Sequence, residues 1–160
     1  MEPGRLEAAR ELLRKAYQLQ VQGDLEAATG LYKQSIALCP TAEAHTFLGW
    51  TYRLLGRLED AIAECRRAIE LDPAFGNPYN DIGAYLIELG CHEEAIPWLE
   101  QATRAPRYET YHYPWYHLGR VYLHQQLYGL ARDCFQHALD IEPGYKPALE
   151  ALESVRRLIQ

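Results

Sequence analysis

Apolar residues recur at three- and four-residue spacing in pairs of segments along most of the chain. Within each pair, a short turn separates the two segments, written QGDL, LGRL, LGCH and QQLY in order along the sequence. This spacing places the apolar side chains on one face of an α-helix. The pattern therefore predicts a series of helical hairpins, each built from two amphipathic helices.

Small residues recur inside these hairpins with a nearly constant period. Gly49, Gly83 and Gly119 have similar surroundings, in FLGWTY, DIGAYL and HLGRVY. An alanine in the second segment and a proline after it follow the same period, at Ala28, Ala61, Ala95 and Ala131 and at Pro40, Pro73, Pro106 and Pro143. A period of roughly 34 residues is typical of stacked supersecondary units. The sequence thus predicts an array of repeats.

A larger residue follows each recurring alanine by one helical turn. These residues are Tyr32, Cys65, Leu99 and Phe135. Large side chains that face small ones at a fixed register allow neighbouring helices to interlock. We therefore expect the glycines and alanines to be packing positions, and the prolines to end the second helix of each pair.

At these positions the chain resembles the tetratricopeptide repeat family. The fourth unit carries the whole pattern, with Trp115, Leu118, Gly119, Tyr122, Ala131, Phe135, Ala138 and Pro143. The resemblance implies an all-α fold, a right-handed α-solenoid of tandem antiparallel helical hairpins. We expect one domain over residues 1–160, with repeats at about 8–40, 41–74, 75–110 and 111–144 and a C-terminal capping helix at 145–160.

The connection into the fourth unit, RYETYHYP, is longer than its counterparts. Its tyrosines, Tyr108, Tyr111 and Tyr113, form either a packed corner of the connection or an exposed contact surface. Both interpretations remain open at the level of sequence.

Composition excludes several classes of protein. The chain has 160 residues, is 48% hydrophobic and 24% charged, and carries a net charge of −6. This balance predicts a folded protein and argues against nucleic-acid binding, which needs a basic face. No apolar run is long enough to span a membrane, and MEPGRLEAAR lacks the apolar segment of a secretory signal. We expect a cytoplasmic protein without membrane insertion.

The sequence offers little to support catalysis. Cys39, Cys65, Cys91 and Cys134 are far apart and form no metal or redox motif, so they are expected to be reduced thiols. There is no nucleophile elbow and no phosphate-binding glycine loop. His117, Arg120 and His124 share a helix face, but solvated or peptide-contacting histidines are a better interpretation than metal ligands. We predict a non-enzymatic protein with no metal and no cofactor.

The resemblance places the candidate site on the concave face, which the first helix of each hairpin lines. At these positions stand aromatic residues with a few polar ones: Tyr17, Phe47, Trp50, Asn80, Asp81, Tyr116, His117 and Arg120. Tyrosine, tryptophan and arginine dominate the binding energy of many interfaces. We therefore predict an adaptor or scaffold that binds a peptide segment of a partner protein in this groove.

Two alternatives bear on the partner. The family's dicarboxylate clamp uses cationic side chains to hold the acidic C-terminal tails of chaperones. Here one matching frame supplies Leu13, Tyr17, Phe47, Asn77 and Asp81, and a frame one repeat later supplies no better set, so such tails are not expected. The second alternative is a self-associating scaffold, in which the groove or the ends of the array form a homo-oligomer interface.

Overall fold

The computed structural model describes residues 2–160, and within that range nine α-helices follow one another through short connections. The first four are α1 (Pro3–Val21), α2 (Leu25–Leu38), α3 (Ala42–Leu54) and α4 (Leu58–Leu71). The remaining five are α5 (Asn77–Glu88), α6 (His92–Arg104), α7 (His112–His124), α8 (Tyr128–Ile141) and α9 (Lys146–Ile159).

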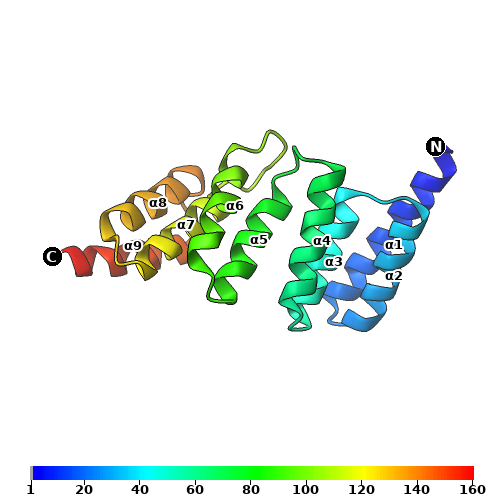
Figure 1. Cartoon of the computed structure of the whole chain (residues 1–160), viewed down its shortest axis with the longest axis horizontal. Coiled ribbons are helices and arrows are strands. Elements are labelled where there is room, and N and C mark those ends of the chain that lie inside the picture. The colour runs from blue at the N-terminus through cyan, green and yellow to red at the C-terminus, as the bar shows by residue number, and fades with distance from the viewer. Residues whose placement is uncertain (1) are drawn as a thin grey trace.

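The helices form an elongated array in which each packs mainly against its neighbours in sequence. Figure 1 shows α1 and α2 at one end of this array and α9 at the other, so that the two termini lie far apart. The predicted all-α solenoid of helical hairpins is confirmed. No helix within residues 2–160 combines the length and the apolar character needed to cross a membrane.

The recurring glycines allow the two helices of a hairpin to approach closely. A Cβ atom on Gly119 of α7 would lie 2.5 Å from Cε1 of Phe135 on α8, and one on Gly49 of α3 would lie 3.2 Å from Sγ of Cys65 on α4. A larger residue at Gly119 would have to displace Phe135, whereas at Gly49 the neighbouring atoms would have to shift by a few tenths of an ångström. The pairing of small with large residues that the sequence predicts is therefore present.

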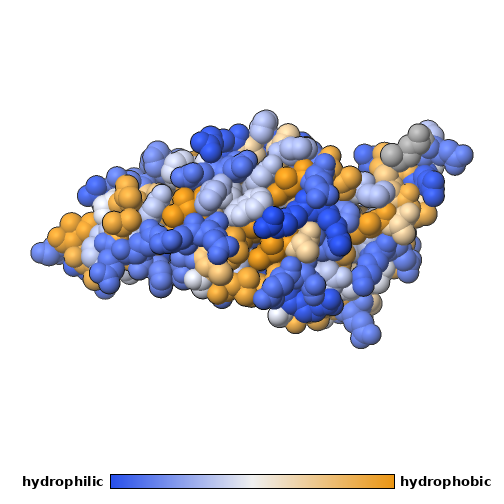
Figure 2. Space-filling view, viewed as in Figure 1, coloured by the Kyte–Doolittle hydropathy of each residue, from blue (hydrophilic) through white to orange (hydrophobic). Residues whose placement is uncertain are grey.

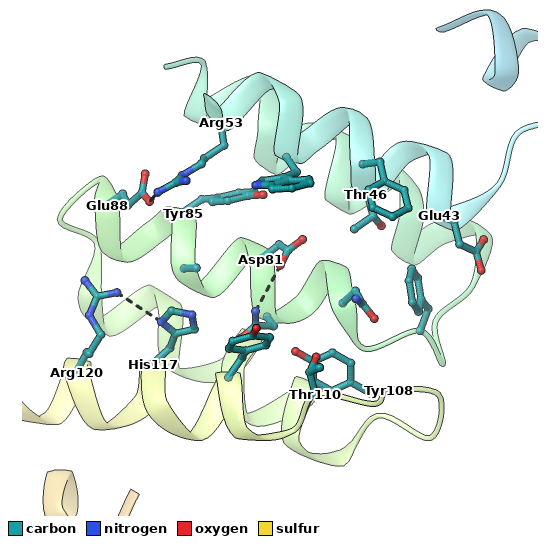
Figure 3. Close-up of a pocket in the computed structure, with 17 residues that line it drawn as sticks. Glu43, Thr46, Arg53, Asp81, Tyr85, Glu88, Tyr108, Thr110, His117 and Arg120 are labelled. Atoms are coloured by element: carbon teal, nitrogen blue, oxygen red, sulfur yellow. Dashed lines mark hydrogen bonds and ion pairs between the residues drawn. The ribbon is translucent and has the colours of Figure 1, made fainter. Parts of the chain in front are cut away.

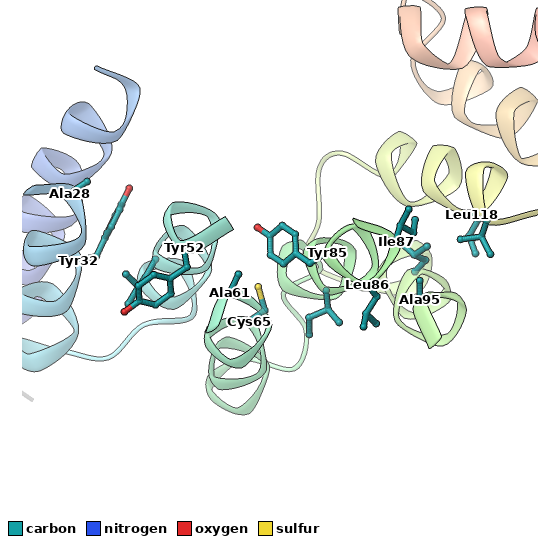
Figure 4. Close-up of a cluster of buried hydrophobic side chains, with 14 of the residues drawn as sticks. Ala28, Tyr32, Tyr52, Ala61, Cys65, Tyr85, Leu86, Ile87, Ala95 and Leu118 are labelled. Carbon is teal, nitrogen blue, oxygen red and sulfur yellow. The ribbon is translucent and has the colours of Figure 1, made fainter. Parts of the chain in front are cut away.

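The core continues from one hairpin to the next as a chain of buried apolar side chains. Figure 4 shows this cluster passing from Tyr32 on α2 through Tyr52 and Tyr85 to Leu118 on α7. Since adjacent repeats share these contacts, the stability of each unit depends on its neighbours.

Each hairpin turns through a residue with a left-handed backbone. In the first three hairpins this residue is a glycine, at Gly23, Gly56 and Gly90, with φ between 78° and 89°. In the fourth it is Gln126, with φ of 62°. Glycine adopts this conformation without strain, whereas other residues resist it. Gln126 is thus the one strained turn of the four.

A buried polar cluster joins the two helices of the second hairpin. His45 Nδ1 on α3 lies 2.6 Å from Glu64 Oε2 on α4, and both side chains are almost fully buried. Arg67 Nη1 also bonds the other oxygen of Glu64, at 2.5 Å. These contacts satisfy a carboxylate that would be costly to bury alone.

Helix α9 ends the array by covering α8. Its Leu152 and Val155 join Phe135 and Leu139 of α8 in a second buried cluster. The exposed side of α9 still carries apolar groups, with Leu158 56% and Ile159 47% exposed.

Candidate functional site

The first helices of three successive hairpins enclose a cavity of about 570 Å³, which we call the groove pocket. Figure 3 shows α3 on one side of it, α5 across its floor and α7 on the other side. From α3 come Glu43, Thr46, Phe47, Trp50 and Arg53, and from α5 come Asn77, Asn80, Asp81, Ala84, Tyr85 and Glu88. From α7 come Tyr113, His117 and Arg120, and the connections add Phe75, Tyr108 and Thr110.

Six of the residues predicted for the site line this pocket together: Phe47, Trp50, Asn80, Asp81, His117 and Arg120. They meet because they occupy equivalent inward positions on α3, α5 and α7, which the repeat places side by side. Tyr17 and Tyr116 are not among the residues that line the pocket, and the structure gives each a different environment.

Tyr17 lies at the edge of the array, beside the pocket's aromatic wall. It is 43% exposed, and its ring meets Phe47 edge-on with centroids 5.5 Å apart. Phe47 in turn stacks on the buried Tyr32, at 6.1 Å and an interplanar angle of 6°. Phe47 is therefore partly a packing residue that fixes α3 against the first hairpin, which its position outside the repeat's packing pattern did not predict.

Tyr116 is engaged by the C-terminal end of the array. Its ring lies edge-on to Tyr145, with centroids 5.4 Å apart, and 5.8 Å from the ring of the buried Phe135. Tyr145 precedes α9, outside the repeat period, so the periodic pattern could not reveal this contact. The expected groove tyrosine of the fourth unit thus packs against the second core cluster.

Asp81 and Asn80 bring two acceptors to the floor of the pocket. Asn80 is only 6% exposed, and its Oδ1 accepts no hydrogen bond from any residue in the described part of the chain. Its Nδ2 donates to Asp81 Oδ1 over a long 3.4 Å. Burial raises the pKa of Asp81 to about 7, and the hydrogen bond from Asn80 opposes that rise.

His117 and Arg120 form the polar edge of the pocket on α7. Arg120 Nη1 lies 3.5 Å from His117 Nδ1, which accepts the hydrogen bond in the neutral imidazole. Burial, followed by the charge of Arg120, lowers the pKa of His117 to about 3. His117 is therefore neutral near pH 7 and Arg120 is the positive group of this edge.

An ion pair between α3 and α5 crosses one end of the pocket. Arg53 Nη2 lies 2.6 Å from Glu88 Oε1, and Arg53 Nε donates to the same oxygen at 3.0 Å. Both side chains are more than a third exposed, so the pair contributes little to stability. Its main effect is to cancel two charges at the pocket's rim.

At the other end of the pocket, Arg107 links the connection between α6 and α7 to the connection between α4 and α5. It forms ion pairs with Glu43 at 3.1 Å and Asp72 at 2.5 Å, and its guanidinium lies 4.2 Å from the centre of the Phe75 ring. The backbones of Phe75 and Arg107 also form an isolated parallel β-bridge. The Gly76 N–H donates a hydrogen bond to the Arg107 carbonyl at 3.0 Å. The guanidinium of Arg107 lowers the pKa of Asp72.

The tyrosine-rich connection is packed, and it also lines the groove. Tyr111 donates to the Ala105 carbonyl at 2.5 Å, and the rings of Tyr108 and Tyr111 meet edge-on at 5.2 Å. Tyr108 lies against Gly76, where a Cβ atom would be 2.6 Å from its ring. Tyr108 and Tyr113 nevertheless face the pocket. The packed interpretation therefore holds for Tyr108 and Tyr111, while contact with a partner through the groups that face the pocket stays a prediction.

Sequence reasoning missed other lining residues for two reasons. Tyr85 and Glu88 follow Asp81 and Ala84 by one helical turn, a spacing that could have indicated them. Phe75 and Thr110 belong to connections, which have no period from which the direction of a side chain could be predicted. No group of three or more potential metal ligands exists within residues 2–160.

Comparison with known families agrees with this architecture. A family model described as Tetratricopeptide repeat matches residues 42–75, and a second model of the same description matches residues 112–145. The chain contains tetratricopeptide repeats. Protein SGT1 homolog of Oryza sativa subsp. japonica is 37% identical over 94 residues, which are 58% of this chain and 26% of that protein. The match thus spans about a quarter of the rice protein's length.

Solved structures show the same fold at low sequence identity. PilF of Pseudomonas aeruginosa superposes with a TM-score of 0.89 at 22% identity, covering 95% of this chain and 69% of that one. YrrB, described as a TPR protein with an unusual peptide-binding site, has a TM-score of 0.70 at 19% identity and covers 92% and 75%. The first TPR of Spaghetti (RPAP3), bound to the HSP90 peptide SRMEEVD, has a TM-score of 0.68 at 18% identity and covers 74% and 92%.

Proposed function

We propose that this chain is a non-catalytic adaptor whose groove pocket binds a peptide segment of a partner protein. The observation that carries the proposal is the pocket itself, a cavity of about 570 Å³ with aromatic walls and exposed polar groups on three successive first helices. Its size and composition suit a few side chains of an extended segment. Two solved structures with this fold are described with peptide sites.

The charges of the pocket argue against an acidic chaperone tail as the ligand. Asp81 lies on the floor, and the nearby Arg53 is already engaged by Glu88. Among the pocket residues that the structure describes, only Arg120 offers a cation without a carboxylate partner. A dicarboxylate would meet one positive group and one negative group, so the HSP90-type peptide is not the expected ligand here.

Trp50 is the best candidate for an energetic anchor. It lines the pocket, is partly exposed, and has no aromatic ring or guanidinium stacked on it within residues 2–160. A partly exposed indole of this kind contributes strongly to the binding free energy when a ligand covers it. Binding on the order of micromolar, or ~8 kcal/mol, is the expected scale for such a site.

The test is a random-peptide display selection against the wild type and the Trp50→Ala variant. Peptides with a common motif that are enriched on the wild type and lost on the variant would support the groove as the binding site. A selection that enriches no peptide on either protein would contradict the proposal.

A second candidate function is self-association, favoured by the apolar groups that α9 leaves exposed. Figure 2 shows hydrophobic residues at the end of the molecule that α9 forms, and Leu149, Leu158 and Ile159 are each about half exposed. Light scattering over a concentration series tests it. A monomer at all concentrations would remove this candidate. The cytoplasmic location stays a prediction from the sequence.

A further inference from the structure

The floor of the groove pocket carries hydrogen-bond acceptors that the described part of the chain satisfies only in part. Asn80 Oδ1 is buried and accepts no hydrogen bond in the described part of the chain. The adjacent Asp81 carboxylate has one long contact, from Asn80 Nδ2 at 3.4 Å. The Asp81 carboxylate is partly exposed in the cavity and accepts only this one contact, so most of its acceptor capacity is open to a ligand that donates hydrogen bonds.

The pocket also contains one carboxylate that has no ion-pair partner among the described residues. The other two carboxylates are paired, Glu88 with Arg53 at 2.6 Å and Glu43 with Arg107 at 3.1 Å. Asp81 has no lysine, arginine or histidine nitrogen within ion-pair distance anywhere in residues 2–160. Arg120, the cation of the pocket without a carboxylate partner in the described chain, contacts His117 instead, so Asp81 is left open to a cationic group of a ligand.

The surroundings of Asp81 can cover the body of a cationic side chain. In Figure 3 the Asp81 carboxylate lies in the middle of the pocket, between Tyr85 and Thr46. Trp50, Tyr108 and Tyr113 add aromatic surface to the same cavity. Aromatic rings attract cations through their faces, and the indole of tryptophan does so most strongly. Aliphatic stems of lysine and arginine also pack well against such surfaces.

We propose that the groove pocket accepts a positively charged side chain, a lysine or an arginine, from the bound segment, with Asp81 as its counter-charge. Trp50 supplies an aromatic wall of the same cavity. This inference rests on the proposed function and specifies the chemistry of its ligand. The site has the opposite charge preference from a clamp for carboxylates.

Proton linkage gives this site a distinctive signature. The cation binds the ionised carboxylate, and burial holds the pKa of the free Asp81 at about 7. Below pH 7 the affinity should fall about tenfold per pH unit, because the carboxylate must lose its proton first. The other groups around Asp81 do not produce this effect. Burial lowers the pKa of His117 to about 3 and raises the pKa of Cys65 on α4, of Tyr85 and of Tyr108.

A small-molecule titration tests the site without knowledge of the partner. Butylammonium and butylguanidinium, with butanol and butyrate as neutral and anionic controls, are titrated into the full chain and followed by NMR. At pH 8 we expect saturable shifts of the Trp50 indole N–H and of the Asp81 carboxyl carbon with the two cations only. At pH 5 the apparent affinity should be at least tenfold weaker.

Two variants make the test specific. Asp81→Asn keeps the shape of the side chain and should abolish both the cation preference and its pH dependence. Glu59→Gln removes an exposed carboxylate of α4 outside the pocket, with the same change in net charge, and should bind as the wild type does. Equal binding of butanol and butylammonium, or cation binding retained in Asp81→Asn, would overturn the inference.

The peptide selection separates failure of this inference from failure of the proposed function. Enriched peptides that keep a lysine or arginine at one position on the wild type, but not on Asp81→Asn, support the inference. Enriched peptides with no fixed basic residue would leave the groove as a peptide site and overturn the cation assignment. If butylammonium binds but the selection enriches no peptide, the cation site is supported and the proposal that its ligand is a peptide is contradicted.

Discussion

Leu99 of α6 occupies the space that a side chain on Gly83 of α5 would fill. A Cβ atom at Gly83 would lie 2.4 Å from Cγ and Cδ2 of Leu99, and Leu99 itself is fully buried. The contact joins two helices of one hairpin in the middle of the array. Because the neighbouring hairpins pack on both helices, the effect of a change here extends beyond the pair.

Gly83→Ala should therefore destabilise the protein although alanine is the better helix former. Overpacking of this kind costs about 1–3 kcal/mol, more than alanine recovers through helix propensity. Thermal or urea unfolding of the variant measures the loss.

Gly30→Ala is the matched control for this substitution. Gly30 lies within α2 and has nothing within 4 Å of an added Cβ atom, so the change should stabilise by about 0.5–1 kcal/mol. Equal melting temperatures for the two variants would contradict the proposed packing.

Replacing Gln126 by glycine should stabilise the fourth hairpin. Gln126 has φ of 62°, whereas the equivalent turns use glycine. Relief of the left-handed strain is worth about 1 kcal/mol. Chemical denaturation should show a higher midpoint for Gln126→Gly, and Gln125→Gly, one residue earlier, should show no gain. A lower midpoint for Gln126→Gly would mean that its side chain stabilises the turn.

The stability of the wild type should depend on pH through Asp81. The folded chain holds the pKa of Asp81 at about 7, above the ordinary 3.8, so ionisation is more costly in the folded state. The contribution of Asp81 is then most favourable below pH 4 and is lost as the pH rises through 7. Asp81→Asn lacks this titration.

The difference in melting temperature between Asp81→Asn and the wild type measures this linkage. It should increase in favour of the variant from pH 5 to pH 8 and level off above that. Asp60→Asn, which removes an exposed carboxylate of α4 outside the pocket, is the matched control for the change in net charge. A constant difference across this range would show that Asp81 titrates as an exposed carboxyl does.

The fold could be predicted because it follows from a repeated local rule. The constant spacing of the repeat predicts that Gly83 packs against Leu99 and that Gly119 packs against Phe135. The inward positions of α3, α5 and α7 follow from the same register. For this reason the period alone is enough to place Trp50 and Asp81 on a shared surface.

The rest of the site depends on segments that do not repeat. Tyr116 packs toward the second core cluster because Tyr145, outside the period, meets its ring. Phe75 and Tyr108 reach the pocket from connections, whose course is set by Arg107 and its ion pairs. Such contacts arise between particular side chains of different units, and a pattern within one unit does not contain them.

The central claim is that the groove pocket binds a peptide, and the affinity of a selected peptide for three proteins tests it most directly. Calorimetry would compare the wild type, Trp50→Ala and Tyr17→Ala; Tyr17 is an exposed aromatic residue outside the pocket. Loss of Trp50 should weaken binding by ~2 kcal/mol, about 30-fold, while loss of Tyr17 changes it little. Equal affinities for the wild type and Trp50→Ala would contradict the account.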